Sequence, residues 1–400
     1  MALPKALYEL EFNHGSIYGP EEMEAALQVM NASAPSSGPK VKEFEEAFAA
    51  YCGRKYALAV SSCTAGLHLA MLAAGVGPGD EVITTPVSWI STANAIAATG
   101  ASVVFADIDP RTLNLDPASV AARITKRTKA ILPVHLYGQP CDMDAIEELA
   151  RPRGILLVED SAHAPGAEYK GRRTGSLGDI GVFSFHQQKN MSTLGEGGMV
   201  VTEDRNLYER VLSFRSLCCR SYDPKGKYLP IDETKEPMGK RYWYLNFDNV
   251  GFNYRMTDIQ AAVGLVQLRK LDGWNARRIE IAKMYDDRLT DIRGLALPYA
   301  SPDVKHVFHI YAVLLKPEFP WTKDEFMWEM YMKRRIKVWS HYTPIHLSTA
   351  YRRLGHGDGE CPVAEACYKQ FVSLPIHPRL TTEAVDYLTT TIVEMAHARI

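Results

Sequence analysis

Two short apolar runs, at residues 154–158 and 180–185, constrain the fold more than any other feature of the chain. Each is rich in aliphatic or aromatic residues, and the chain then reaches Asp160 after the first run and Lys189 after the second. Runs of this length and composition are typical of buried parallel strands. Because ligands bind outside the carboxyl ends of such strands, we expect Asp160, Ser184 and Lys189 to meet at one edge of a sheet.

The residue types at this edge predict a particular chemistry. A lysine placed among aromatic residues and glycines suits a partly desolvated amine, and desolvation or neighbouring cations lower its pKa until it becomes a nucleophile for a carbonyl. Pyridoxal phosphate (PLP) needs such a lysine for a Schiff base, an acid that keeps its ring nitrogen protonated, and donors for its phosphate. The sequence therefore predicts a PLP site with Lys189 and Asp160 as catalytic residues.

Three motifs, at residues 159–163, 184–190 and 195–198, resemble the DegT/DnrJ/EryC1/StrS family of sugar aminotransferases. The likeness extends over almost the whole chain, whose 400 residues exceed what one hydrophobic core usually organises. It implies an aspartate-aminotransferase-like α/β fold: a large PLP-binding domain with a mostly parallel sheet, residues 1–272, and a smaller C-terminal α+β domain, residues 273–400.

The resemblance also implies a reaction. A PLP-dependent transaminase of this family moves an amino group from an amino-acid donor, glutamate or glutamine, to a keto sugar, often nucleotide-linked, or to a ketocyclitol. Pyridoxamine phosphate (PMP) is the intermediate form of the cofactor, and amino-sugar biosynthesis is the expected setting.

A predicted strand at residues 56–60 runs through small residues into a helix, and such a helix N-terminus binds anions. An ordinary helix cap without a ligand is the alternative. The family places the cofactor phosphate at this turn, which implies contacts from Cys63, Thr64 and Ala65. Cys63 stands where relatives often have glycine, a replacement that reduces backbone freedom.

Four further cofactor contacts follow from the resemblance. Trp89 matches the aromatic residue that stacks on the pyridine ring, and Ser184 belongs to the lysine motif. His163 matches the residue that contacts the ring face or the 3-hydroxyl, with a structural histidine as the alternative. Asn253 matches the asparagine that reaches the phosphate of the neighbouring subunit, which implies a homodimer with shared active sites.

The segment 218–250 has little periodicity and many basic and aromatic residues, which predicts an extended loop. Its basic residues are candidates for a substrate phosphate and its aromatic residues for a base or sugar; packing on a partner subunit is an equal alternative. The candidates in this segment are Lys225, Lys227, Lys240, Arg241 and Tyr242. Other substrate candidates are His186, His341 and Tyr342, of which the last two end a predicted strand at residues 338–342 and lead into a loop.

Composition narrows the remaining possibilities. A formal net charge of −2 at pH 7 argues against nucleic acid and anionic membranes as partners. The seven cysteines are odd in number and form no CxxC pair, and the N-terminus has no secretory signal, so we expect reduced thiols and a cytoplasmic location. His135 has no second ligand at metal spacing, so no metal site is predicted.

Two other functions stay open. The first is a PLP-dependent dehydratase or another lyase on the same fold, although the dehydratase branch of the family carries histidine where this chain has Lys189. The second is a non-enzymatic regulator, for which the sequence offers neither a helix-turn-helix nor a basic patch.

Overall fold

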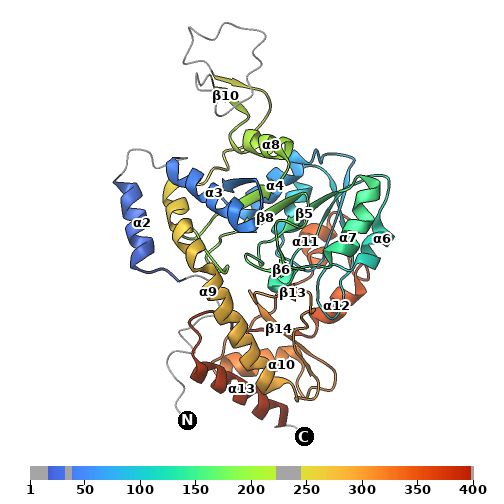
Figure 1. Cartoon of the computed structure of the whole chain (residues 1–400). Helices are drawn as coiled ribbons and strands as arrows, with labels where there is room; N and C mark the ends of the chain where they lie inside the picture. The colour runs from blue at the N-terminus through green and yellow to red at the C-terminus, as the bar shows by residue number, and fades with distance from the viewer. Residues whose placement is uncertain (1–16, 32–37, 222–244, 398–400) are drawn as a thin grey trace.

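The computed structural model describes residues 17–31, 38–221 and 245–397, with a seven-stranded sheet at the centre of this part of the chain (Figure 1). Its strands are β1 Tyr56–Val60, β2 Glu81–Thr84, β3 Ser102–Phe105, β4 Thr128–Leu132, β5 Leu156–Asp160, β8 Ile180–Ser184 and β9 Gly198–Thr202. Their spatial order is β1-β9-β8-β5-β4-β2-β3. Strands β8, β5, β4, β2 and β3 run parallel, whereas β9 is antiparallel to both β1 and β8. The prediction of an α/β fold with a mostly parallel sheet is confirmed.

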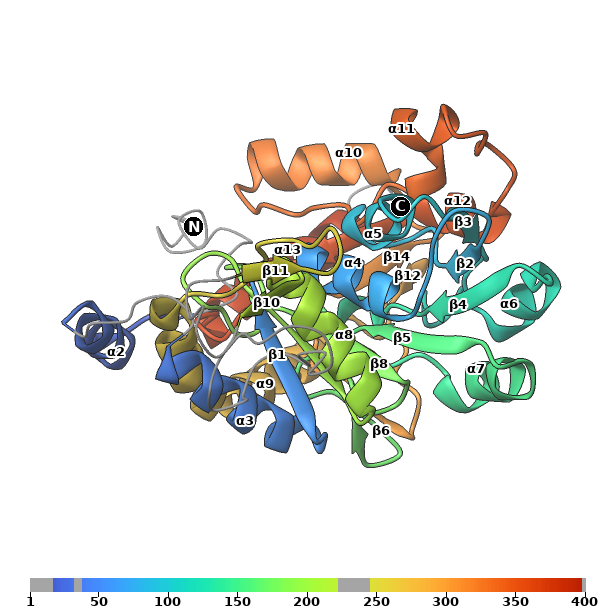
Figure 2. The same ribbon diagram turned by 90° about the horizontal axis from the view of Figure 1, so that it is seen from above.

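Helices cover both faces of this sheet because its strands are apolar on both sides (Figure 2). The helices on one face are α4 Cys63–Ala73, α5 Ser91–Ala97 and α8 Arg205–Arg215, and those on the other include α3 Pro39–Cys52, α6 Pro117–Arg123 and α7 Met143–Ala150. Along β8, Val182 faces the first layer and Phe183 the second. A Cβ atom on Gly66 of α4 would lie 2.7 Å from Cγ1 of Val182, so glycine allows α4 to pack directly on the sheet.

One helix, α9 Asp258–Leu289, runs for 32 residues from the central sheet into the C-terminal part of the chain (Figure 1). Thr257 and Gln260 form the predicted capping box at its start. The predicted domain boundary after residue 272 falls inside this helix, and the division into two domains stays a prediction.

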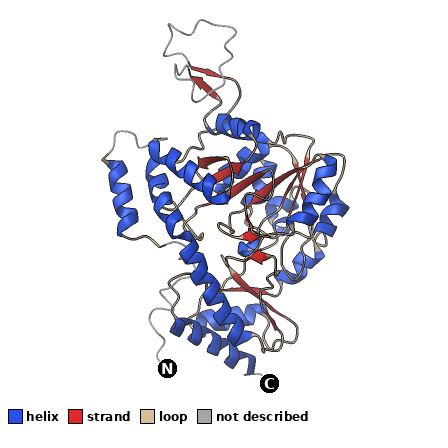
Figure 3. Ribbon diagram, in the orientation of Figure 1, coloured by secondary structure: helices blue, strands red, loops and turns tan. Residues whose placement is uncertain are grey.

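The C-terminal part is built on an antiparallel sheet in the order β12-β14-β15. Its strands are β12 Leu295–Ala296, β14 Tyr311–Leu315 and β15 Phe371–Leu374, and its helices include α10 Lys323–Trp328 and α13 Thr382–His397. Buried residues such as Tyr285, Phe326 and Leu388 form a separate core between the second half of α9 and this sheet. Helices therefore cover one face of the small sheet, and residues of its other face, such as Ala312 and Leu314, pack into the core of the large sheet (Figure 3).

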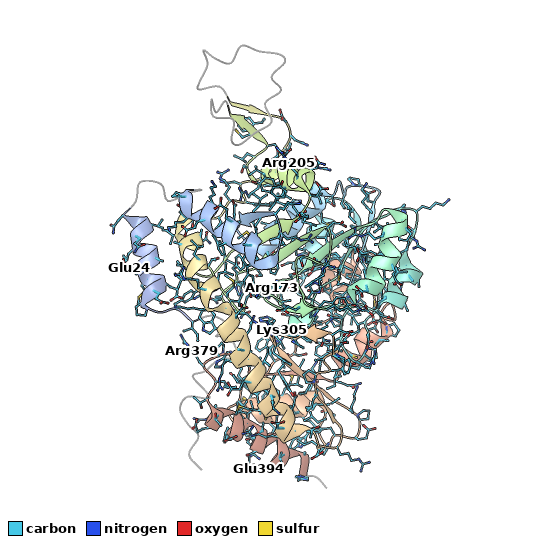
Figure 4. All side chains as sticks on the ribbon, viewed as in Figure 1. Glu24, Arg173, Arg205, Lys305, Arg379 and Glu394 are labelled. Carbon is cyan, nitrogen blue, oxygen red and sulfur yellow. The ribbon has the colours of Figure 1, made fainter. Side chains whose placement is uncertain are left out.

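The shorter elements connect these layers. They are the helices α2 Pro20–Met30, α11 Thr349–Arg352 and α12 Pro362–Tyr368, the π-helix Glu329–Lys333, the 3-10 helices Leu136–Gly138, Arg151–Arg153 and Ile345–Leu347, and the strands β6 Glu168–Tyr169, β7 Arg172–Arg173 and β13 Val304–Lys305. Arg173 of β7, labelled in Figure 4, donates to Oδ2 of Asp272 on α9 at 3.2 Å, and its guanidinium lies 3.7 Å from the centre of the Tyr51 ring.

Two predicted segments differ from the structure. In the segment 218–250, predicted as a loop, β10 Cys219–Ser221 pairs antiparallel with β11 Leu245–Phe247, and residues 222–244 lie outside the described residues. Strands of three residues are too short to leave a periodic signal. The predicted strand at residues 338–342 is reduced to a single antiparallel bridge between Trp339 and Ser373 of β15.

None of the helices in the described part of the chain has the length and apolar character that a membrane crossing needs.

Candidate active site

A cavity of about 550 Å³ lies at the carboxyl ends of β5 and β8. Its walls come from these strand ends, the N-terminus of α4, the loop between β2 and α5, the turn after β8, and the segment 337–342. The residues predicted from the sequence that line it are Cys63, Thr64, Trp89, Asp160, His163, Ser184, His186, Lys189, His341 and Tyr342. Most of the predicted residues that the structure describes therefore meet in one site, at the carboxyl ends of the strands as expected.

Lys189 lies in the turn after β8, and its neighbour fixes that turn. The backbone N–H of Lys189 donates to the carbonyl oxygen of His186 at 2.8 Å. Asn190 is fully buried, and its Nδ2 donates to Oδ1 of Asn275 on α9 at 2.8 Å and to the carbonyl oxygen of Val307 at 3.2 Å. Helix α9 therefore holds the turn that carries Lys189.

Burial lowers the pKa of Lys189 from its usual 10.5 to about 8. The acidic groups of Cys63, Asp160 and Glu196 act in the opposite direction. The sequence predicts a lowered pKa through desolvation or neighbouring cations, and in the structure desolvation is the cause. A lysine with this pKa is about one-tenth free amine at pH 7, whereas a lysine with the usual pKa is less than one-thousandth free amine.

Asp160 ends β5 and is buried at the base of the cavity. Its Oδ2 accepts a hydrogen bond from the Thr92 hydroxyl at 2.8 Å, and its Oδ1 accepts one from the backbone N–H of Ala162 at 3.1 Å. Since Thr92 uses its hydrogen on Asp160, Ser88 donates to Thr92 at 2.9 Å. Burial raises the pKa of Asp160, although these hydrogen bonds and Lys189 oppose the rise.

The adjacent carboxylate, Glu159, points to the other side of the strand and does not line the cavity. It accepts hydrogen bonds from the backbone N–H groups of Gly175, Leu177 and Gly178, and from Nε2 of His135 at 2.9 Å. Burial alone would raise the pKa of Glu159, but His135 and the backbone donors outweigh burial and lower it. Glu159 is thus a structural partner of His135, the histidine for which no metal role is predicted.

His163 is buried and carries a defined tautomer. Its Nδ1 accepts from the backbone N–H of Tyr137 at 3.3 Å, so its proton lies on Nε2, which donates to the hydroxyl oxygen of Tyr342 at 3.3 Å. The ring stacks on His309 with a centroid distance of 4.5 Å and on Tyr342 at 5.9 Å. Burial, assisted by the positive charge of Lys189, lowers the pKa of His163 well below its usual range, so the ring is neutral at pH 7.

The N-terminus of α4 forms a second polar wall. Ser62 caps the helix by accepting from the backbone N–H of Ala65 at 3.1 Å. The N–H groups of Cys63 and Thr64 belong to the first turn, where a helix offers no internal acceptor. A Cβ atom on Gly198 of β9 would lie 2.8 Å from the Cys63 nitrogen, so glycine is required for this close approach. The arrangement is suited to an anion.

Three other predicted residues complete the lining. Trp89 is 60% exposed, and its ring meets Tyr342 edge to face at 6.1 Å. Ser184 is buried and its Oγ accepts from the backbone N–H of His186 at 3.3 Å. The His186 ring lies 3.9 Å from the Glu196 carboxylate, and burial lowers its pKa.

One protein-family model matches residues 17–393, nearly the whole chain, and it describes the DegT/DnrJ/EryC1/StrS aminotransferase family. The chain belongs to this family. The resemblance inferred from the motifs is confirmed, and so is the prediction that the chain is an enzyme with aminotransferase relatives.

Similar proteins are known both as sequences and as solved structures. GDP-perosamine synthase of Caulobacter vibrioides is 41% identical over 367 residues, which cover 91% of this chain and 92% of that protein. The structure of DesV from S. venezuelae in complex with a ketimine intermediate is 37% identical, covers 94% of each chain and has a TM-score of 0.84. Spr1654 of Streptococcus pneumoniae, solved in a PMP form and a PLP form, is 27% identical over 96% of this chain and 98% of its own, with TM-scores of 0.87 and 0.86. These structures confirm the aminotransferase-like fold.

Some predicted residues of this DegT-family chain do not reach the cavity. Ala65 is buried behind Ser62, which takes its N–H. Asn253 is exposed and bridges Ser216 through the backbone, and its action on a neighbouring subunit stays a prediction. Lys225, Lys227, Lys240, Arg241 and Tyr242 lie outside the described residues.

Eleven lining residues were not among the predicted ones, and five of these bear on the contacts of the site: Ser62, Thr92, Glu196, Lys337 and Trp339. Glu196 lies in the motif 195–198, Ser62 follows the strand predicted at residues 56–60, and Thr92 lies three residues after Trp89; these positions were the available signal. Lys337 and Trp339 are two residues apart in an extended segment that ends at His341. Period-two spacing from His341 could have pointed to them.

Proposed function

We propose that this chain is a PLP-dependent sugar aminotransferase. It transfers an amino group from glutamate or glutamine to the keto carbon of a nucleotide-linked keto sugar or of a ketocyclitol. The observation that carries the proposal is the presence in one cavity of Lys189, with its pKa lowered to about 8, and the buried carboxylate of Asp160. The names of GDP-perosamine synthase and of the PLP and PMP forms of Spr1654 support the acceptor class and the cofactor.

The residues around the cavity fit PLP. The first turn of α4, which includes Thr64, would hold the phosphate together with Ser184. The N-terminus of α4 lies at the cavity, and the backbone N–H groups of this turn are available to an anion there. Asp160 would hold the ring nitrogen, and Trp89 and His163 would contact the ring. The donor set therefore matches the three chemical parts of the cofactor: phosphate, ring nitrogen and flat ring.

When bound, PLP supplies an aldehyde and an electron-withdrawing ring that stabilises negative charge at the reacting carbon of the substrate. Lys189 Nζ removes the proton from the α-carbon of the donor and later delivers a proton to the acceptor carbon. Its lowered pKa suits both directions near neutral pH, because a base and its conjugate acid are then both populated.

With PLP bound, Asp160 would keep a proton on the ring nitrogen by accepting a hydrogen bond from it. The raised pKa of Asp160 makes this carboxylate a stronger acceptor than an exposed aspartate. Thr92 and Ala162 fix its orientation, so it needs no rearrangement to act. His163 is neutral and therefore adds no competing positive charge beside the ring.

The assembly we propose is a homodimer in which Asn253 of one subunit reaches the cofactor phosphate of the other. The location we propose is the cytoplasm, which agrees with seven cysteines that are all free thiols.

A product screen tests the function. PLP-loaded protein is incubated with glutamate or glutamine and a panel of nucleotide-linked keto sugars and ketocyclitols, and products are identified by mass spectrometry, with Lys189→Ala as the control. We expect an amine in place of the keto group for at least one acceptor. A deoxygenated product without an amine would instead support the dehydratase, and a colourless protein that takes up no PLP would support the regulator.

A further inference from the structure

The segment 337–342 contributes one wall of the cavity from the C-terminal part of the chain. Trp339 exchanges two backbone hydrogen bonds with Ser373 of β15, at 3.2 and 2.8 Å, which hold the segment extended. Alternate side chains of an extended segment point to opposite sides. Lys337, Trp339 and His341 accordingly line the cavity, while Val338 is buried in the C-terminal core; Tyr342, at the end of the segment, departs from the alternation and also lines the cavity.

Lys337 gives this wall a positive charge. Among the described residues that line the cavity, the lysines are Lys189 and Lys337, and none is an arginine. The lining carboxylates are Asp160, which the proposed function assigns to the cofactor ring, and Glu196, which lies beside His186. With Lys189 assigned to proton transfer, Lys337 is the lysine of this wall that is placed to bind an anionic part of a substrate.

Aromatic rings continue from Lys337 along the wall. The Lys337 ammonium lies 5.9 Å from the centre of the Trp339 ring, which is 6.4 Å from His341, and His341 is 4.8 Å from Tyr342. Tyr342 in turn meets Trp89 at 6.1 Å. Trp339 is 50% exposed, so much of its surface is available to a ligand. A cation followed by flat apolar rings is suited to a ligand that carries a phosphate next to a ring.

We propose that Lys337 and Trp339 form a subsite for the phosphate-bearing end of the acceptor, in which Lys337 binds phosphate oxygens and Trp339 packs against the adjoining ring. The subsite rests on the proposed function, because it concerns the acceptor of that reaction. Neither residue belongs to the motifs that carry the family resemblance. The carboxylates of the amino-acid donor are the rival anions for Lys337.

Binding of acceptor fragments tests the subsite without knowledge of the sugar. The probes are GDP, UDP, dTDP and inorganic pyrophosphate, and their dissociation constants for the PLP-loaded protein are measured by calorimetry. For the nucleoside diphosphate that binds best, Lys337→Ala should weaken binding about tenfold, the effect of one charge-assisted hydrogen bond. The difference from wild type should shrink as salt is added.

Two variants sharpen the result. Trp339→Ala should weaken binding of the nucleoside diphosphates but leave pyrophosphate unchanged. Lys333→Ala is the matched control, because Lys333 is 68% exposed, pairs with Glu329 at 2.8 Å and does not line the cavity. It should bind every probe as wild type does. Equal losses in Lys333→Ala and Lys337→Ala would overturn the subsite, since general surface charge would then explain them.

The donor half-reaction separates the subsite from its rival and from the function itself. The colour change on adding glutamate should follow the same concentration dependence in wild type and Lys337→Ala, which also shows that the variant is folded. A higher glutamate requirement with unchanged diphosphate binding would assign Lys337 to the donor and overturn the proposal, as would wild-type protein that binds none of the probes. Absence of the colour change in wild type with glutamate and also with glutamine would refute the proposed function, and diphosphate binding that depends on Lys337 would still support the subsite.

Discussion

Replacing Asp160 by asparagine should reduce catalysis far more than folding stability, and replacing the adjacent Glu159 by glutamine should do the reverse. Asparagine keeps the shape of Asp160 but removes the charge that holds a proton on the ring nitrogen. A group aimed at developing charge in an active site contributes about 10²–10³-fold to kcat, so we expect a loss of that order. The pKa of Asp160 is raised, which means that the fold disfavours its ionised form, so removing the charge should cost little stability near pH 7.

Glutamine at position 159 has a different effect because Glu159 is an acceptor for several donors. Its two oxygens accept from the backbone N–H groups of Gly175, Leu177 and Gly178 at 2.6–2.8 Å, and from His135. A glutamine places an NH₂ group against one of these donors. Each buried donor left without an acceptor costs about 1–3 kcal/mol of unfolding free energy.

The same contacts predict how stability depends on pH. The pKa of Glu159 is lowered from its usual 4.5, so its contribution to stability is fully present above pH 4.5 and is lost as the pH falls through the depressed value. Below pH 4.5, Glu159→Gln should therefore lose stability less steeply than wild type does.

Two measurements check the prediction. Thermal and urea unfolding report the stability of each variant, and kcat of the PLP-saturated enzymes reports catalysis. Asp160→Asn should unfold within a few degrees of wild type, and Glu159→Gln should unfold earlier but keep the kcat of its folded fraction. A near-normal kcat in Asp160→Asn, or a large loss of kcat in a stable Glu159→Gln, would refute the assignment of the two carboxylates.

Three other predictions follow from the same site. Lys189→Ala should abolish turnover and the adduct that borohydride traps on PLP-loaded protein; a trapped adduct on another lysine would contradict it. The rate at which Lys189 captures the PLP aldehyde should rise with pH and level off above about 8, because the neutral amine is the nucleophile, and stopped-flow absorbance that is flat through this range would count against the lowered pKa. Co-expressed Lys189→Ala and Asn253→Ala chains should regain activity, since random pairing leaves about a quarter of all sites wild type in a shared-site dimer. Asn253→Ala must first be shown to be impaired alone, and mixtures no more active than their parents would then exclude the shared site.

The sequence predicted several strands of the seven-stranded sheet because the signal of each lies within one short stretch of the chain. The strand predicted at residues 56–60 has the same bounds as β1, and the run 180–185 differs from β8 by one residue. The run 154–158 was predicted two residues too early, because β5 continues through Glu159 and Asp160. An acidic residue usually marks the end of a buried strand. Here the strand continues because the carboxylate oxygens of Glu159 and Asp160 accept hydrogen bonds from donors in other segments of the chain.

The sequence did not predict site residues whose position depends on contacts with distant parts of the chain. Trp339 is held by Ser373, 34 residues further along the chain, and the side to which Lys337 points follows from that pairing. Likewise, Thr92 is one of several hydroxyl residues after β2, and only its contact with Asp160 distinguishes it. A motif within one segment was enough to identify Lys189. The cavity residues that come from the C-terminal part of the chain could be identified only from the three-dimensional structure.

Helix α9 sets a limit on how the length of this chain can change during evolution. Its 32 residues extend about 48 Å at 1.5 Å per residue, and one inserted residue rotates everything beyond it by about 100°. An insertion before Asn275 would turn that side chain away from Asn190 and release the turn beside Lys189. Homologous chains should therefore differ freely in length between β10 and β11 but keep the span from Thr257 to Asn275 constant, and a collection of such sequences can be checked for that pattern.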